Sequence, residues 1–167
     1  ASGIVQWLPP GRGLVGLSIT PTTIRIDADH EILLSKLIEG SYPDYRAITA
    51  QQHGSAAAFD RKALMTSVQR VSAFLDRNAG IQIDIGTDEV GISARRDESE
   101  ASETIQADPA EGAKAASIGL SPYYLLDALK SLTANRALIQ YTSPSHPVTI
   151  IGTDGEDPKL ILMTRRI

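Results

Sequence analysis

The sequence predicts an α+β protein in which a strand–helix–strand–strand–strand unit occurs twice, after a short all-β segment. Apolar and polar residues alternate over several short segments, which is typical of half-buried strands. Two other segments repeat apolar residues every three or four positions, which is typical of helices. The order of these segments over residues 56–107 recurs over residues 115–167, so the chain carries a structural duplication. Two such units can pair edge to edge into one antiparallel sheet surface, with both helices on one side.

We expect two domains, residues 1–48 and residues 49–167. Three short alternating apolar segments between Leu14 and Ile38, separated by turns, predict a three-stranded meander in the first domain. Pro9 to Gly13 break any earlier strand, and Gly40 to Pro43 end the last one. The first domain therefore has no helix and is expected to be partial.

The first helix is predicted to run to about Arg77, after a short strand from Ala56 to Phe59 and with Asp60 as its N-cap. Its apolar residues are spaced four, three and four positions apart: Leu64, Val68, Val71 and Leu75. The opposite face carries basic or neutral side chains and no carboxylate near its centre: Lys62, Thr66, Gln69, Ala73 and Arg77, with Arg70 on the flank. In a chain with a net charge of −4, such a face is unexpected.

The remaining elements follow from the same patterns. After the first helix we expect strands at 81–85, 90–94 and 104–107, with a polar stretch from Arg96 to Glu103 and a loop at 108–112. The order then restarts with a strand at 115–120, Ser121 as N-cap and Pro122 at the first helical position, where a missing N–H costs nothing. The second helix runs to about Leu132, and three strands follow: 137–141, 148–151 and 160–163.

Composition excludes several classes of protein. The absence of cysteine excludes disulfides and thiolate metal sites and agrees with a reducing compartment. No run approaches the roughly 20 apolar residues of a membrane span, and the first residues show no basic-then-apolar signal pattern, so we expect a cytoplasmic protein without a membrane partner. His30, His53 and His146 have no partners at ligand spacing, and no nucleophile or phosphate-loop pattern occurs. We therefore expect no metal, no cofactor and no catalytic residue.

Four ordered segments resemble the C-terminal portion of the bacterial DNA sliding clamp, the β subunit of DNA polymerase III. They are Ser35 to Arg46 (SKLIEGSYPDYR), Ile118 to Leu129 (IGLSPYYLLDAL), Thr142 to Val148 (TSPSHPV) and Leu160 to Ile167 (LILMTRRI). The similarity covers nearly all of residues 14–167. It implies the DNA-clamp fold and a homo-oligomeric processivity factor, set on DNA by a clamp loader, whose helices line a ring around duplex DNA.

The resemblance also implies two sites. The DNA-facing residues would be Lys62, Gln69, Arg70, Arg77 and Lys130, contacting phosphates without reading bases. The groove for the short peptide motif of DNA polymerase and other clamp-binding proteins would be lined by Pro43, Ile48, Ser121, Tyr124, Ser145, Pro147, Ile161, Leu162, Met163, Thr164, Arg165, Arg166 and Ile167. Without the resemblance, the basic residues would be a solvated helix face. Ile161 to Met163 would be a core strand and Tyr124 a packing residue.

Three departures from the family leave an alternative open. The chain holds about one and a half of the family's three domains, and the T-D-G-H-R-L motif that completes the groove is absent. Thr164 and Arg165 replace the terminal Pro-Met, which adds a charge at the groove rim. The alternative is therefore a truncated clamp-like protein-binding module that does not encircle DNA, and a small enzyme is a third class. Because unpaired strand edges need cover, we also expect residues 1–48 to pair with a second copy in a two-fold dimer.

Overall fold

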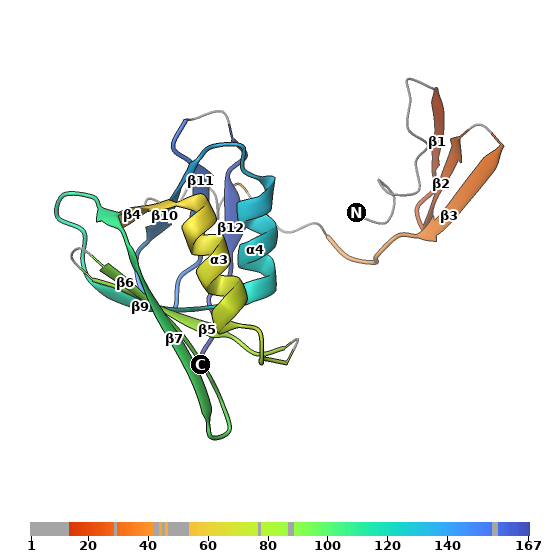
Figure 1. Cartoon of the computed structure of the whole chain (residues 1–167). Helices are drawn as coiled ribbons and strands as arrows, with labels where there is room; N and C mark the ends of the chain where they lie inside the picture. Colours follow the sequence, from red (N-terminus) through yellow and green to blue (C-terminus); the bar gives the residue numbers. More distant parts are fainter. Residues whose placement is uncertain are drawn as a thin grey trace. The chain divides into compact units, whose positions relative to one another are not determined.

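The structure, a computed structural model, describes residues 14–28, 30–41, 44, 46, 54–76, 78–86, 89–154 and 157–167. The chain separates into two compact units, residues 1–45 and residues 46–167. Each unit has its own sheets (Figure 1). Among the described residues, neither helix is long and apolar enough to span a membrane.

The first unit contains a three-stranded antiparallel sheet in the order β1-β2-β3. Its strands are β1 (Val15–Ile19), β2 (Thr23–Ala28) and β3 (Glu31–Lys36). Leu17 lies opposite Ile26, and Ile26 lies opposite Leu33, so these three side chains share one face of the sheet. The side chains of Arg25 and Asp27 form an ion pair on the other face. That these residues are a partial clamp domain stays a prediction.

The described residues of the second unit form two antiparallel sheets and two helices. The five-stranded sheet has the order β12-β11-β10-β4-β8, and the four-stranded sheet has the order β7-β6-β5-β9. The first copy of the unit supplies β4 (Ser55–Asp60), α3 (Arg61–Val71), β5 (Ile81–Ile85), β6 (Glu89–Arg96), β7 (Ser99–Gln106) and β8 (Asp108–Pro109). The second copy supplies β9 (Ala116–Leu120), α4 (Pro122–Ser131), β10 (Arg136–Tyr141), β11 (Val148–Gly152) and β12 (Leu160–Leu162).

The two copies are joined by exchange of their first strands. Strand β4 of the first copy pairs with β10 of the second, and β9 of the second pairs with β5 of the first. The expected α+β class and duplicated unit are confirmed, but the expectation of one sheet joined edge to edge is wrong. Each first strand crosses into the other copy's sheet, which makes two sheets and ties the copies together.

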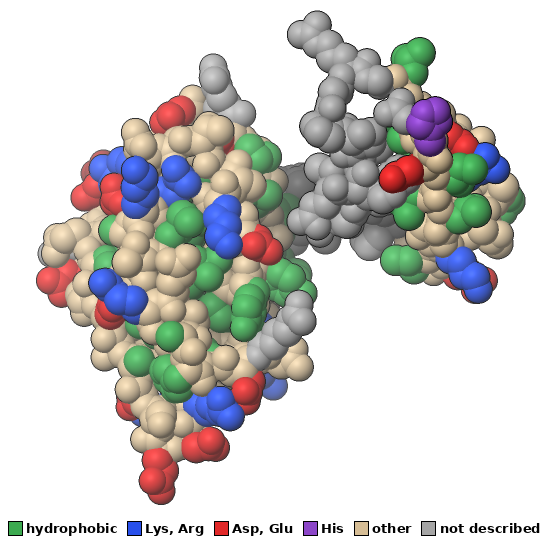
Figure 2. Space-filling view, turned by 45° about the vertical axis from the view of Figure 1, so that its right-hand side comes forward, with side chains coloured by type: hydrophobic (Ala, Val, Ile, Leu, Met, Phe, Trp, Pro, Cys, Tyr) green, Lys and Arg blue, Asp and Glu red, His purple; other side chains and the backbone are tan. Residues whose placement is uncertain are grey.

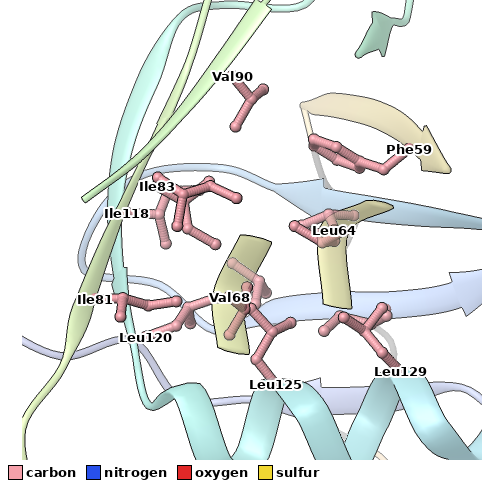
Figure 3. Packing of buried hydrophobic residues seen from close by; sticks show 14 of the residues in the cluster. Phe59, Leu64, Val68, Ile81, Ile83, Val90, Ile118, Leu120, Leu125 and Leu129 are labelled. Atoms are coloured by element: carbon pink, nitrogen blue, oxygen red, sulfur yellow. The ribbon is translucent and has the colours of Figure 1, made fainter. Parts of the chain in front are cut away.

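The hydrophobic core lies between the helices and the two sheets. Helices α3 and α4 lie side by side, as predicted (Figure 1). Figure 3 shows Leu64 and Val68 of α3 and Leu125 and Leu129 of α4 pointing toward side chains from both sheets. These four leucine and valine side chains are fully buried. Burial of this shared stripe, more than helix propensity, holds two short helices in place.

Two predicted boundaries are wrong. Helix α3 ends at Val71 rather than near Arg77, and residues 72–74 form a turn in which Ser72 N–H donates to the Val68 carbonyl over 3.0 Å. The polar stretch from Arg96 to Glu103 is mostly strand, because β7 pairs with the whole length of β6. Cross-strand pairing overrides the low strand propensity of glutamate and serine at these positions.

Candidate functional site

The predicted DNA-facing residues lie on the exposed faces of the two helices. Lys62, Gln69 and Arg70 are on α3 and Lys130 is on α4, and all four are exposed. The start of α3 meets the end of α4, because the Arg61 guanidinium donates to the carbonyl oxygens of Leu129 and Ala134. Lys62 and Lys130 therefore lie on the same end of the helix pair. Arg77 lies outside the described residues.

The helix itself carries no carboxylate near the centre of this face, but a carboxylate from another element reaches its flank at Arg70. Its Nε lies 2.5 Å from an oxygen of Glu103, which reaches over from the edge strand β7. Hydrogen bonds from Arg70, and then from Ser67, hold the pKa of the Glu103 carboxyl below its usual range. Lys130 Nζ lies 3.9 Å from an oxygen of Asp127 one turn earlier in the helix. Among the described residues, Lys62 has no ion-pair partner, so it is the predicted lysine most available to a phosphate.

Charge on the surface of this unit is correspondingly mixed. Figure 2 shows lysine and arginine side chains scattered over its visible face, several with acidic side chains beside them. Exposed ion pairs of this kind contribute little to stability because solvent screens them. They reduce the local positive potential that a DNA backbone would meet.

A groove lies along α4, the last strand and the chain that follows it. Its volume is about 680 Å³. Its lining residues are Ser121, Tyr124, Asp127, Ala128, Ser131, Leu160, Ile161, Leu162, Met163, Thr164 and Arg165. The structure thus brings together seven of the predicted residues: Ser121, Tyr124, Ile161, Leu162, Met163, Thr164 and Arg165.

The other predicted groove residues fall elsewhere. Ser145, Arg166 and Ile167 line a separate cavity of about 600 Å³, together with Thr164 and Arg165, so the C-terminal segment lines both cavities. Pro147 lines neither cavity, and Pro43 and Ile48 lie outside the described residues.

The sequence prediction missed four groove residues. They are Asp127, Ala128, Ser131 and Leu160. The three on α4 follow Tyr124 at helical spacing, so the period of the helix would have found them.

Burial separates the groove residues into a floor and an exposed rim. Leu162 is 8% exposed and belongs to the core, as the packing alternative required. Tyr124 is 71% exposed and Met163 66%, so neither is a packing residue. An apolar floor beside exposed aromatic and thioether side chains is a surface suited to an apolar peptide side chain.

The C-terminal segment that forms one wall of the groove is held by hydrogen bonds from Arg165. Its backbone N–H donates to the Gly119 carbonyl over 2.8 Å. Its guanidinium donates to the Asn78 carbonyl over 2.6 Å and to the Ala79 carbonyl over 3.4 Å. A Cβ on Gly119 would lie 2.8 Å from the Ile167 side chain, so only glycine lets the segment cross β9 here. Arg165, which adds a positive charge at the groove rim, therefore also holds the C-terminal segment in place.

Solved structures that resemble this chain are DNA sliding clamps. A sliding clamp from Bartonella birtlesii bound to griselimycin matches with a TM-score of 0.80 and 20% identity, over 99% of this chain and 44% of that chain. The DNA polymerase III beta subunit from Pseudomonas aeruginosa matches with a TM-score of 0.77 and 23% identity, over 93% of this chain and 43% of that one. The fold is therefore that of a DNA clamp.

The family follows from the sequence comparison. The model of the DNA polymerase III beta subunit, C-terminal domain, matches residues 46–166, and the chain belongs to this family. The beta sliding clamp of Bacillus subtilis is 29% identical over 147 residues, which are 86% of this chain and 39% of that protein. The beta sliding clamp homolog GriR of Streptomyces muensis is 27% identical over 143 residues, 86% of this chain and 38% of that protein. The chain thus spans about two-fifths of the length of these relatives.

Proposed function

We propose that this chain acts in DNA replication as part of a sliding clamp, a non-catalytic processivity factor for DNA polymerase III. The observation that carries the proposal is the groove between α4 and the C-terminal segment, in a chain of the clamp family. The groove would accept a short apolar peptide segment from the polymerase and from other clamp-binding proteins. The buried Leu162 would form its floor, and the exposed Tyr124 and Met163 would close over the peptide.

We choose griselimycin as the probe for the proposed groove, since the Bartonella clamp was solved with it bound. We expect calorimetric titration to show binding to the wild-type chain and about tenfold weaker binding to Tyr124→Ala, because exposed aromatic anchors dominate such interfaces. Tyr123→Ala is the matched control, since Tyr123 is exposed on the same helix but does not line the groove. Equal loss in the two variants, or none in either, would show that the groove is assigned wrongly.

The helix face would meet the phosphates of duplex DNA without reading its sequence. Lys62 supports this most strongly, since Arg70 and Lys130 each have a carboxylate close by. Each phosphate contact makes log affinity fall with log salt by a slope of about 0.9. We expect retention on duplex DNA to fall with salt, and Lys62→Glu with Arg70→Glu to abolish it.

Arg95→Glu is the control for DNA binding. Arg95 lies near the C-terminal end of strand β6, not on either helix, and its side chain pairs with Glu100. If the wild-type chain binds griselimycin but shows no salt-sensitive retention on DNA, the DNA-encircling role fails. The protein-binding module then becomes the better description.

Assembly is the last part of the proposal. We infer a cytoplasmic homo-oligomer that a clamp loader sets on DNA. Exposed apolar side chains on both faces of the sheet of the first unit support pairing between copies: Val15, Leu17 and Ile19 on one face, and Ile32 and Leu34 on the other. Exposed apolar patches of this kind are unusual for a monomer. Gel filtration with light scattering tests this, and a monomer at micromolar concentration would contradict it.

A further inference from the structure

The N-terminus of α4 is left open. Ser121 occupies the N-cap position with extended backbone angles, yet its side chain makes no capping hydrogen bond. Pro122 has no N–H, and the Tyr123 and Tyr124 N–H groups have no acceptor within the described part of the chain. Helix N-termini carry partial positive charge and unsatisfied donors, which together attract anions. An open end alone is common, so a second observation is needed.

The second observation is the Ser121 hydroxyl. Ser121 is only 5% exposed, and no described group donates to its side chain or accepts from it. A buried hydroxyl without a partner costs free energy, and native structures seldom keep one without a ligand or a water molecule. Ser121 lines both the groove and a smaller cavity beside it, of about 270 Å³. The unpartnered hydroxyl therefore faces space that a ligand can enter.

We call this smaller cavity the α4 end site. Its lining residues are Asn78, Ser121, Tyr123, Tyr124, Asp127 and Arg165. Arg165 brings a full positive charge, and its hydrogen bonds to Asn78 and Ala79 use only two of the five donors of a guanidinium. The remaining donors, the Ser121 hydroxyl and the open helix end all favour a negatively charged oxygen ligand.

Asp127 decides which anion the site favours. Its carboxylate also lines the site, and Lys130, at 3.9 Å, offsets its charge only in part. A doubly charged phosphate would meet stronger repulsion there than a singly charged carboxylate. A carboxylate also matches the planar fork of the guanidinium.

We propose that the α4 end site binds the side-chain carboxylate of an acidic residue in the peptide that occupies the groove. The site and the groove share Ser121, Tyr124, Asp127 and Arg165, so one extended peptide reaches both. This inference rests on the proposed function, because it requires a peptide in the groove. It adds a preference for acid over amide at one position of that peptide.

The test uses two acetylated, amidated hexapeptides that carry the same leucine and phenylalanine residues for the groove and differ only as Glu against Gln at the N-terminal end. By fluorescence anisotropy in low salt, we expect the Glu peptide to bind about tenfold tighter, as one charge-assisted interaction at a helix end allows. Ser121→Ala and Arg165→Gln should each reduce this ratio toward one. Arg166→Gln is the control, since Arg166 lines the other cavity and should keep the ratio.

The outcomes are distinct. Equal affinity of the two peptides for the wild-type chain, or tighter binding of the Gln peptide, would overturn the carboxylate site while leaving the groove intact. Failure of both peptides and of griselimycin to bind would overturn the groove, and the carboxylate site with it. Arg165 also holds the C-terminal segment in place, so Arg165→Gln can change the groove itself. Ser121→Ala is therefore the decisive variant. If that variant weakens both peptides equally, Ser121 shapes the groove without recognising a carboxylate.

Discussion

The two copies of the repeated unit begin their helices in different ways. Around the start of each helix, residues of the first copy have counterparts 61 positions later, so Asp60 and Ser121 are equivalent N-caps. The Asp60 carboxylate accepts a hydrogen bond from the Ala63 N–H over 2.8 Å and closes the start of α3. The Ser121 side chain makes no capping hydrogen bond, and α4 starts beside the groove. The duplication has kept its packing in both copies and has left one helix end available for a ligand.

The strongest test of this comparison is at the equivalent leucines of the two helices. Leu64 and Leu125 both lie four positions after their N-caps, and both are fully buried. Leu64→Ala and Leu125→Ala should each lower the free energy of unfolding by about 3 kcal/mol, since each removes a buried side chain and leaves a cavity. Urea denaturation of the two variants measures this. A cost below about 1 kcal/mol for either would mean that the copies do not share one core.

The next test addresses a position where the copies differ because the C-terminal segment crosses only one of them. Gly119 is equivalent to Ala58, which carries its methyl group without difficulty in β4. Gly119→Ala would push against the Arg165 carbonyl oxygen and the Ile167 side chain and should cost about 2 kcal/mol, as overpacking usually does. It should also weaken griselimycin binding by moving the groove wall.

Ala58→Gly is the control for this substitution. It should cost about 0.5–1 kcal/mol through chain entropy alone, with griselimycin affinity unchanged. If Gly119→Ala keeps full stability and full affinity, the C-terminal segment does not lie across β9.

The sequence predicted the parts of the fold that repeat locally and missed those set by distant partners. The stripes of Leu64, Val68, Leu125 and Leu129 follow from helical spacing, and both helices begin where expected. Strand β7 was assigned only in part, because its serine and glutamate residues carry little strand signal until they pair with β6. The exchange of first strands could not be predicted either, because it depends on pairing between segments that are far apart in the sequence.

In the candidate site, too, local features were predictable from the sequence and long-range contacts were not. Residue type identified Ser121 as an N-cap, but could not tell that its hydroxyl makes no capping bond. The tether from Arg165 reaches Ala79, which is 86 positions away in the chain. The ion pair of Arg70 and Glu103 also joins distant segments, so the charge of the helix face was overestimated. Long-range polar contacts of this kind depend on the folded arrangement.

The difference between the two N-caps can itself be measured. Asp60→Ala should lower the free energy of unfolding by about 1 kcal/mol, since it removes the cap of α3. Ser121→Ala should leave it almost unchanged, because no capping bond is lost. Ser121→Asp should stabilise α4 by supplying the missing cap, and should abolish the preference for the Glu peptide. Equal costs for the two alanine variants in urea denaturation would show that both helix ends are capped alike.

The smallest expected effect concerns the loops that follow the two helices. After α3, the Arg96 guanidinium donates to the Phe74 carbonyl over 3.1 Å. After α4, the Asp157 carboxylate instead accepts hydrogen bonds from the N–H groups of Thr133 and Ala134, over 2.8 and 2.9 Å. These bonds, first that from the Thr133 N–H, lower the pKa of Asp157 below its usual range. The second copy is therefore expected to loosen in acid through the bonds that hold its helix end.

The sign of this pH dependence follows from the lowered pKa. A carboxylate whose folded-state pKa lies below its unfolded value of about 3.9 stabilises the fold above that value, and the contribution is lost as the pH falls through the folded-state pKa. Asp157→Asn should therefore lower the Tm at pH 7, and the gap from the wild type should narrow as the pH falls below the unfolded value of about 3.9. Thermal unfolding at pH 7, 5 and 3 measures the gap. A constant gap for Asp157→Asn would mean that neutral Asp157 holds the loop as well as the carboxylate does.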